Sequence, residues 1–350
     1  MDIFTEDRQQ IINLPTNTVS FFFFGCWNQN KEATAKIITE INEKNDCQFG
    51  IVCGDNVYPE TISDTSGNKT KVGNINDIRE GFDILKLFNG QIYIGLGNHE
   101  VDSTQPCKSL IDEKVNANLN IHMPNNYYSI LINCTNGSIS KIIILDTNVL
   151  EYNKCYGDYN EDAVEQMLTW LQTELDNCNT SHITPIVIGH YPLFYFKNNK
   201  KNGKYEFQIE YTMAKINNIL IQFKKPVHYL CADIHNYQFF IKDNIHHHIV
   251  GTGGAIQDLV SENNLIFQIQ IDDDIYNVIK STQKYGYLYV NIENGFLTCQ
   301  FNSIDTDVVI KDKKNNSIDT KSGVLIGGYE KKYLKYKNKY LKSKNKTNLV

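Results

Sequence analysis

Apolar residues in the body of the chain are concentrated in short continuous runs, which longer polar or mixed segments separate. The runs occupy residues 19–24, 49–52, 92–96, 141–145, 183–188 and 227–231. They are rich in Phe, Ile and Val and do not alternate with polar residues, a pattern typical of strands buried on both faces of a sheet. The runs therefore predict the central strands of a largely parallel sheet.

Other segments predict helices and, later in the chain, a hairpin. Residues 31–44 and 161–177 have the apolar spacing of an amphipathic helix. From about residue 245 the pattern changes to strands and turns, and the last two apolar runs flank an Asn-Gly turn, which is a hairpin signal. We predict an α/β fold with a polar leader (1–14), one domain (15–305), and a linker with a basic tail (306–350).

The composition supports a large folded core. The chain has 350 residues, of which 41% are hydrophobic, so a disordered or fibrous chain is excluded. No apolar stretch reaches the ~18–20 residues of a transmembrane helix. The opening MDIFTEDRQQ has acidic residues where a secretory signal has basic ones, so we expect no signal peptide. The nine cysteines include no C-x-x-C pair and are expected to be reduced thiols.

The charge is unevenly distributed along the chain. Residues 331–346 contain eight Lys and no acidic residue, which leaves 26 basic residues against 40 acidic ones elsewhere. An acidic body lacks the clustered Lys and Arg that a nucleic-acid backbone requires. We therefore expect no nucleic acid at the core domain, whereas the basic tail is a candidate for binding a protein or an anionic partner.

Polar motifs follow five of the apolar runs directly. They are GCWN (25–28), GDNVY (54–58), GNHE (97–100), GHYP (189–192) and ADIHN (232–236). Because functional groups of open α/β sheets gather at the carboxyl ends of strands, these motifs are expected to meet. Carboxylate, amide, imidazole, phenolate and thiolate groups together suit a hard or borderline metal ion.

The order of these motifs resembles the calcineurin-like metallophosphoesterases, and among them the mammalian-type purple (tartrate-resistant) acid phosphatases. The family pattern reads GDWG, GDNFY, GNHD, GHYP and GHDHN, and the resemblance covers roughly residues 17–302. It implies a four-layer αββα sandwich of two mixed sheets flanked by helices. It also implies hydrolysis of phosphate monoesters by a hydroxide that two metal ions activate, with iron paired with Fe, Zn or Mn.

The resemblance also assigns roles to individual residues. Asp55 would bridge the two ions, and His99 would be the general acid for the leaving-group oxygen. The first ion, ferric in the family, would take Cys26, Asp55, Tyr58 and His235. The second would take Asp55, Asn98, His190 and Asp233. The resemblance assigns no substrate-binding residues, because the polar loops at 61–75 and 197–206 match nothing in the family.

Two ligand positions depart from the family pattern. Cys26 stands where the family has Asp, and Asp233 stands where it has the first His of GHDHN. A thiolate keeps the charge of the Asp that it replaces, but Asp233 adds a negative charge at the second ion. Extra anionic ligands reduce Lewis acidity and repel a phosphate dianion. The alternative function is therefore a catalytically degenerate phosphatase fold that acts as a binding or virion-associated protein.

Two further features are interpreted separately. In the triple His246 to His248, consecutive strand residues point to alternate faces, so at most His246 and His248 could share an ion, and we interpret the triple as structural. The tail reads YEKKYLKYKNKYLKSKNK (329–346) and repeats Tyr-Leu-Lys after seven residues. It is similar to a terminal segment that recurs in proteins of giant DNA viruses. If the protein is viral, we expect it in the host cytoplasm or the virion, and otherwise in the cytoplasm. The alternative interpretation is that the tail is a solvated, mostly disordered segment without a partner.

Overall fold

The computed structural model describes residues 8–58, 60–63, 69–72, 75–101, 120–150, 161–181, 183–199, 204–223, 225–260 and 267–304. Most of the strands in these ranges belong to two mixed sheets. The nine-stranded sheet has the order β1 (Gln9–Leu14), β8 (Tyr128–Cys134), β9 (Ile139–Ile144), β10 (Pro185–Ile188), β13 (Val227–Cys231), β15 (Ile245–Val250), β14 (Tyr237–Lys242), β17 (Asp274–Thr282) and β16 (Phe267–Ile271).

The six-stranded sheet has the order β19 (Phe296–Ser303), β18 (Gly286–Glu293), β2 (Thr18–Phe24), β3 (Phe49–Cys53), β6 (Gln91–Gly95) and β7 (Ile121–His122). Two hairpins stand apart from the sheets, β4 (Glu60–Ser63) with β5 (Lys69–Val72) and β11 (Phe194–Asn199) with β12 (Lys204–Ile209). The helical segments are α1 (Lys31–Lys44), α2 (Ile75–Leu85), α3 (Asn98–Val101), η1 (Thr147–Leu150), α5 (Glu161–Thr180), η2 (Tyr211–Met213) and α6 (Ala214–Gln222).

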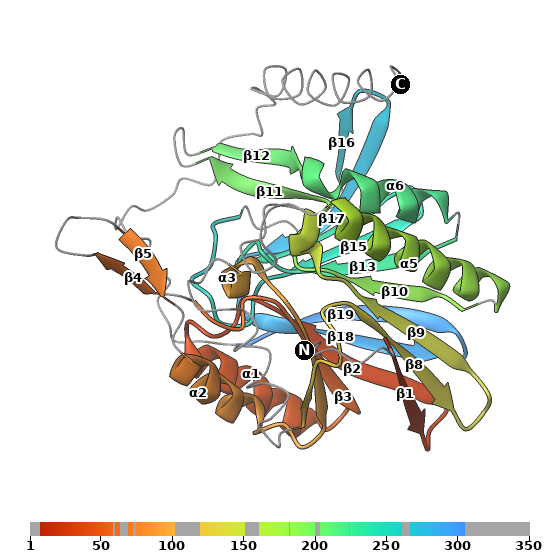
Figure 1. The fold of residues 1–350 in the computed structure, drawn as a ribbon, viewed down its shortest axis with the longest axis horizontal. Helices are drawn as coiled ribbons and strands as arrows, with labels where there is room; N and C mark the ends of the chain where they lie inside the picture. Colours follow the sequence, from red (N-terminus) through yellow and green to blue (C-terminus); the bar gives the residue numbers. More distant parts are fainter. Residues whose placement is uncertain are drawn as a thin grey trace.

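The two large sheets pack face to face between two layers of helices. Helices α1 and α2 lie beside the six-stranded sheet, and α5 and α6 lie beside the nine-stranded sheet (Figure 1). Along β10 the side chains alternate accordingly, because Ile186 and Ile188 pack in the core cluster that includes the six-stranded sheet, whereas Val187 packs with the helices α5 and α6. The predicted α/β sandwich is confirmed.

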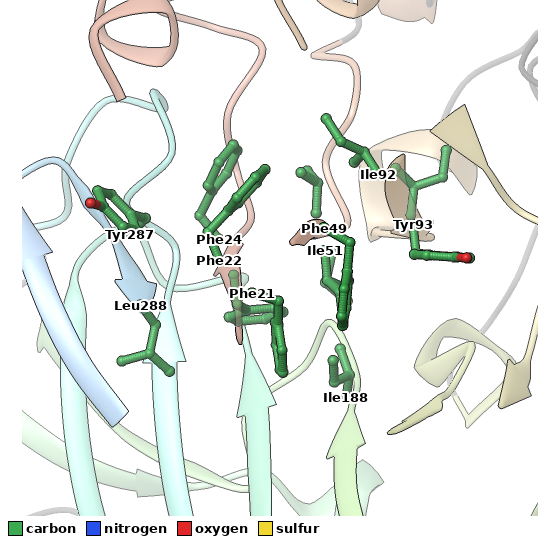
Figure 2. Packing of buried hydrophobic residues seen from close by; sticks show 14 of the residues in the cluster. Phe21, Phe22, Phe24, Phe49, Ile51, Ile92, Tyr93, Ile188, Tyr287 and Leu288 are labelled. Carbon is green, nitrogen blue, oxygen red and sulfur yellow. The ribbon is translucent and has the colours of Figure 1, made fainter. Parts of the chain in front are cut away.

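The continuous apolar run of β2 follows from its position between a helix and a second sheet. Phe21 to Phe24 are all completely buried. Phe22 stacks on Phe24 at 5.6 Å between ring centroids, while Phe21 stacks on Phe49 at 5.1 Å. In Figure 2, Phe22 and Phe24 lie together and Phe21 lies toward Ile188. Each fully buried Phe contributes about 1.5–3 kcal/mol of hydrophobic free energy, so this strand anchors the core.

Helix α1 has the bounds that the apolar spacing predicts. Its N-cap Asn30 accepts a hydrogen bond from the backbone N–H of Ala33, and its C-cap Asn45 adopts a left-handed conformation with φ of 48°. These caps satisfy backbone groups that a helix end leaves without partners. The helix buries Ile37, Ile38 and Ile41, and this packing places its N-terminus next to the loop after β2.

The N-terminus differs from the sequence prediction. Residues 9–14 of the predicted leader form β1, which pairs in parallel with β8 over its whole length. Three of its six residues are polar, and all its side chains are half-buried or exposed, which is why the pattern resembles a leader. The tail, including residues 306–350, lies outside the described residues.

Two further observations concern the whole described part of the chain. All seven cysteines within it are free thiols, as predicted. In these ranges no helix is long and apolar enough to cross a lipid bilayer. The predicted hairpin is also present, because β18 and β19 are antiparallel and join through Asn294 and Gly295, which both have positive φ.

Candidate metal centre

The five sequence motifs meet at the carboxyl ends of parallel strands from both sheets. Strands β2, β3 and β6 run in parallel in one sheet, and β9, β10 and β13 do so in the other. Backbone hydrogen bonds join the strand ends across the two sheets, for example from Gly25 N–H to the Val250 carbonyl at 3.0 Å. The fold therefore brings loops that are far apart in sequence to one edge of the sandwich.

Three of the predicted ligands have a left-handed backbone. The φ angles are 52° at Cys26, 53° at Asp55 and 57° at Asp233, and each residue lies one or two positions beyond the end of its strand. This conformation is uncommon outside glycine and is most accessible to Asn and Asp, so Cys26 is the least favourable of the three. The sharp turn at each strand end directs the side chain across the edge of the sheet.

Close packing beneath the site depends on two glycines. A Cβ atom at Gly54, which has φ of 80°, would lie 2.1 Å from Nδ1 of His190. A Cβ atom at Gly97 would lie 2.2 Å from the backbone nitrogen of Asp55. No side chain fits at such distances, so the glycines that open two of the motifs allow the loops to touch.

Asp55 lies at the centre of the arrangement and is 1% exposed. Its Oδ1 is 3.3 Å from Nε2 of His190 and accepts the backbone N–H of His99 at 3.2 Å. Its Oδ2 is 3.6 Å from the Cys26 sulfur, which donates. Burial alone would raise the pKa of Asp55, but the charge and hydrogen bond of His190 lower it well below its usual range. A permanently ionised carboxylate with partners on both oxygens is suited to bridging two cations.

His190 is completely buried and held on both sides of its ring. Nδ1 is 3.3 Å from the Cys53 carbonyl, and Nε2 is 3.0 Å from Oδ1 of Asn98. Burial lowers the pKa of His190, but Asp55 and Asp233 outweigh it and raise the pKa to about 9. A backbone carbonyl on Nδ1 is the usual way to orient a metal-binding imidazole, because it directs Nε2 toward the ion.

Tyr58, His235 and Cys26 lie together on the other side of Asp55. The Tyr58 hydroxyl is 3.5 Å from Nε2 of His235, whose Nδ1 is 2.8 Å from the Ile256 carbonyl. Burial and then Asp55 raise the pKa of the Cys26 thiol, and burial and then Cys26 raise the pKa of Tyr58, so without a cation both are neutral.

Asp233 and His99 complete the set of predicted residues. Asp233 Oδ1 is 3.8 Å from Nε2 of His190, and burial raises the pKa of Asp233, with the charge of Asp55 adding to the effect. The His99 side chain is one quarter exposed, lies 3.9 Å from Oδ2 of Asp55 and packs 4.7 Å from the Tyr58 ring. The other seven predicted site residues therefore lie around Asp55, with His99 partly open to solvent.

Glu100 is a residue that the sequence analysis leaves without a role. It is 1% exposed, and its two oxygens accept backbone N–H groups from Asp55, Asn56, Val57 and Gly97, with the Asp55 and Val57 bonds at 3.2 Å. One carboxylate thus ties the loop after β3 to the loop after β6. The only sequence signal is its place at the end of the GNHE motif.

The donor atoms fit a group of hard or borderline cations. One donor atom each of Cys26, Asp55 and His190 lies within 4.8 Å of the other two, and all three residues are buried. Oδ1 of Asp55 and Oδ1 of Asn98 both face Nε2 of His190, at 3.3 and 3.0 Å, and buried acceptors in this position need a cation or a proton between them. The arrangement could therefore hold metal ions and activate a group bound at the exposed side.

Comparisons with known proteins were made on sequence and on fold. The sequence profile of the family described as calcineurin-like phosphoesterase matches residues 19–237. No curated protein sequence matches the chain. Among solved structures, GAP50, described as the anchor in the inner membrane complex of Plasmodium, has a TM-score of 0.56 and 14% identity, over 82% of this chain and 85% of that one.

Two further solved structures have lower scores. A dimetal phosphatase from Danio rerio has a TM-score of 0.47 and 10% identity, over 81% of this chain and 96% of that one. PhoD has a TM-score of 0.49 and 11% identity, over 96% of this chain and 78% of that one.

Proposed function

The chain belongs to the calcineurin-like phosphoesterase family, and on this premise we propose that it hydrolyses phosphate monoesters with two bound metal ions, as purple acid phosphatases do. One observation carries the proposal. Asp55 is ionised and buried, and the predicted donors approach it from two sides. The family supports metal-dependent phosphoester hydrolysis in general, and the motif sequence supports the narrower assignment to monoesters.

We assign the ligands according to this arrangement. One ion, which we propose to be iron, would be held by Cys26, Tyr58 and His235. The other, an Fe, Zn or Mn ion, would be held by Asn98, His190 and Asp233. Asp55 would be shared between the two ions. When bound, the two cations supply Lewis acidity to the phosphoryl group.

The protein's own groups would position and protonate the substrate. Glu100 holds the two loops that carry Asp55 and His99 at a fixed separation. The partly exposed His99 ring stands beside Asp55, where it can give a proton to a leaving oxygen on the solvent side.

Charge is the main obstacle to turnover. Asp233 replaces a neutral imidazole of the family pattern, and burial together with Asp55 raises its pKa. The charge of Lys197, on β11, acts in the opposite direction on Asp233. We propose that Lys197 offsets part of this added negative charge and attracts the phosphate ester.

Metal content and hydrolysis test the proposal together. Protein purified without chelator is analysed for Fe, Zn and Mn, and hydrolysis of an aryl phosphate is measured from pH 4 to 8. We expect two metal equivalents at this site and turnover that Asp55→Asn abolishes. The matched control is Asp83→Asn, which changes an exposed carboxylate paired with Lys86. Metal-free protein, or turnover equal in the Asp55→Asn variant, would overturn the proposal.

A second candidate function is that of a binding protein on a degenerate phosphatase fold. The replacements Cys26 and Asp233 favour it, because they weaken the electrophilic character of the site. The printed description of GAP50 as an anchor is compatible with such a role for this fold. Protein that binds metal but does not hydrolyse the aryl phosphate under any condition would favour this candidate.

A further inference from the structure

A second group of metal-ligand side chains lies between the two sheets, away from the strand ends. His228 on β13 and His248 on β15 come from the nine-stranded sheet, and Cys299 on β19 comes from the six-stranded sheet. One ring nitrogen of each histidine and the cysteine sulfur lie within 4.8 Å of one another. We call these three residues the inter-sheet cluster.

The register of the strands explains how the cluster forms. His228 pairs with His246 on the neighbouring strand, and His248 lies two residues further along the same face. That face points toward the six-stranded sheet, because Leu230 and Val250 on it belong to the core cluster shared by the two sheets. Strand alternation alone allows His246 and His248 to share an ion, and the structure adds His228 and Cys299 from other strands.

The two histidines have buried nitrogens without partners. His228 is 8% exposed and His248 is 2% exposed. Nδ1 of His228 and Nε2 of His248 make no hydrogen bond to any of the described residues. A buried polar atom left in this state costs about 1–3 kcal/mol, so an interacting group is expected at this position.

The surroundings prepare both imidazoles to bind a cation. Burial and then His246 lower the pKa of His228 to about 3, and burial lowers that of His248 well below its usual value, so both rings are neutral at pH 7. Nδ1 of His248 is 3.3 Å from the Tyr237 hydroxyl. When that nitrogen donates to Tyr237, Nε2 of His248 presents its lone pair, which is the arrangement found behind metal-binding histidines.

We propose that the inter-sheet cluster binds one Zn²⁺ ion, which links the two sheets. Two imidazole nitrogens and one cysteine sulfur are the donors that zinc prefers, and they do not favour Mg²⁺ or Ca²⁺. His246, whose ring centroid is 4.7 Å from that of His228, supplies a candidate fourth ligand. The site does not depend on the proposed phosphatase activity.

Binding of an ion to the cluster requires entry from solvent and release of the Cys299 proton. His246 and Cys299 are only partly buried, so we expect the ion to enter from their side of the cluster. Burial raises the pKa of Cys299 to about 12, so binding of Zn²⁺ must displace the thiol proton. The alternative explanation for the buried His248 is aromatic stacking without a metal ion, because the Phe239 ring lies 4.0 Å from the His248 ring and is nearly parallel to it.

The first test needs no mutation. Metal-free full-length protein is alkylated with iodoacetamide with and without Zn²⁺, and each cysteine is followed by peptide mass spectrometry. We expect Zn²⁺ to slow modification of Cys299 by roughly tenfold or more. Cys47, a half-buried cysteine outside both sites, serves as the internal control and should be unaffected. The proposal would be overturned if Cys299 were alkylated at the same rate with and without Zn²⁺, or if Zn²⁺ protected only Cys26.

The second test uses Co²⁺ as a spectroscopic substitute for zinc. Cys26→Ser removes the thiol that we assign as a ligand at the candidate metal centre, so any thiolate-to-cobalt absorption in that variant reports another cysteine. We expect the absorption to persist in Cys26→Ser, and to disappear when Cys299→Ser or His228→Gln is added. Adding Cys47→Ser is the control. Absorption that survives Cys299→Ser, in variants whose circular dichroism is unchanged, would refute the inter-sheet site.

Discussion

The candidate metal centre and the inter-sheet cluster use the same kinds of side chain in opposite ways. At the centre, the predicted ligands lie on loops, three of them have left-handed φ, and several of their donor atoms contact one another. In the cluster, the ligands lie within strands, and two nitrogens lack partners among the described residues. Loop ligands can be adjusted for chemistry, whereas strand ligands are fixed by the sheet, which suits a structural ion.

The electrostatics of the two regions differ as well. The centre concentrates carboxylates, so that His190 has a raised pKa of about 9. In the cluster no carboxylate contributes to the pKa of His228 or His248, and burial lowers both. We therefore expect the centre to attract cations from solution through charge, and the cluster to bind a softer ion through the lone pairs of neutral rings.

The largest expected effect comes from disabling the two regions separately. Asp55→Asn should reduce kcat/KM by at least about 10²-fold, because Lewis-acid stabilisation is worth several kcal/mol. Zn²⁺ protection of Cys299 should remain in this variant. Cys299→Ser should instead remove one zinc equivalent, with a far smaller change in kcat. Elemental analysis and steady-state kinetics on the same preparations measure the metal content and the activity. If each variant loses both activity and the inter-sheet zinc, the two regions are not independent.

A smaller effect is expected from Glu100, which joins two loops of the centre. Glu100→Gln replaces a carboxylate that accepts four backbone N–H groups with an amide that is a poorer acceptor and carries no charge. Hydrogen bonds to charged groups contribute about 1.5–3 kcal/mol, and we expect metal-free protein to lose about that much stability. Urea unfolding of metal-free protein measures it.

The matched control for this prediction is Glu80→Gln. Glu80 is exposed and forms an ion pair with Lys31 across the surface of α1 and α2. The unfolding free energy of Glu80→Gln should therefore stay within about 0.5 kcal/mol of the parent value. Equal unfolding midpoints for Glu100→Gln and Glu80→Gln would show that the carboxylate does not hold the loops together.

The next effect concerns the two residues that depart from the family pattern. Asp233→His removes a negative charge from the centre, and Cys26→Asp restores a residue that adopts the left-handed conformation more readily. We expect the double variant to raise kcat/KM for an aryl phosphate by about tenfold, equivalent to about 1.4 kcal/mol. If the double variant is no more active than the parent, charge does not limit turnover.

Much of the centre could be predicted because its information is local. Each motif follows an apolar run, and parallel strands place their carboxyl ends at one edge, so Asp55, Asn98 and His190 were expected to meet, and they do. The left-handed backbone of Cys26 and the role of Glu100 were not predicted. Both depend on how closely two loops approach, and apolar spacing carries no information about that distance.

The inter-sheet cluster, in contrast, could not be predicted from local sequence patterns. Its residues are isolated in sequence. They meet because β13 and β15 are in one register and because Cys299, on β19 of the other sheet, lies beside their histidines. A triple histidine therefore predicts nothing by itself, since its partners come from other strands. Strand β1 was missed for a related reason, because an edge strand with half-exposed side chains lacks the continuous apolar run of central strands.

The smallest expected effect tests whether the centre receives its substrate through Lys197. This residue is half-buried on β11, and its charge opposes the rise in pKa that burial causes at both Asp233 and Glu210. Lys197→Ala should raise KM for an aryl phosphate about three- to fivefold with little change in kcat, because one partly screened charge contributes up to about 1 kcal/mol. Lys197→Arg, which keeps the charge, should stay near the parent value. Steady-state kinetics at low and high salt measure both, and the difference should shrink with salt because screening weakens the attraction. A fall in kcat at unchanged KM would instead place Lys197 in the chemical step, and it would remove the distinction between residues that attract the ester and residues that hold the ions.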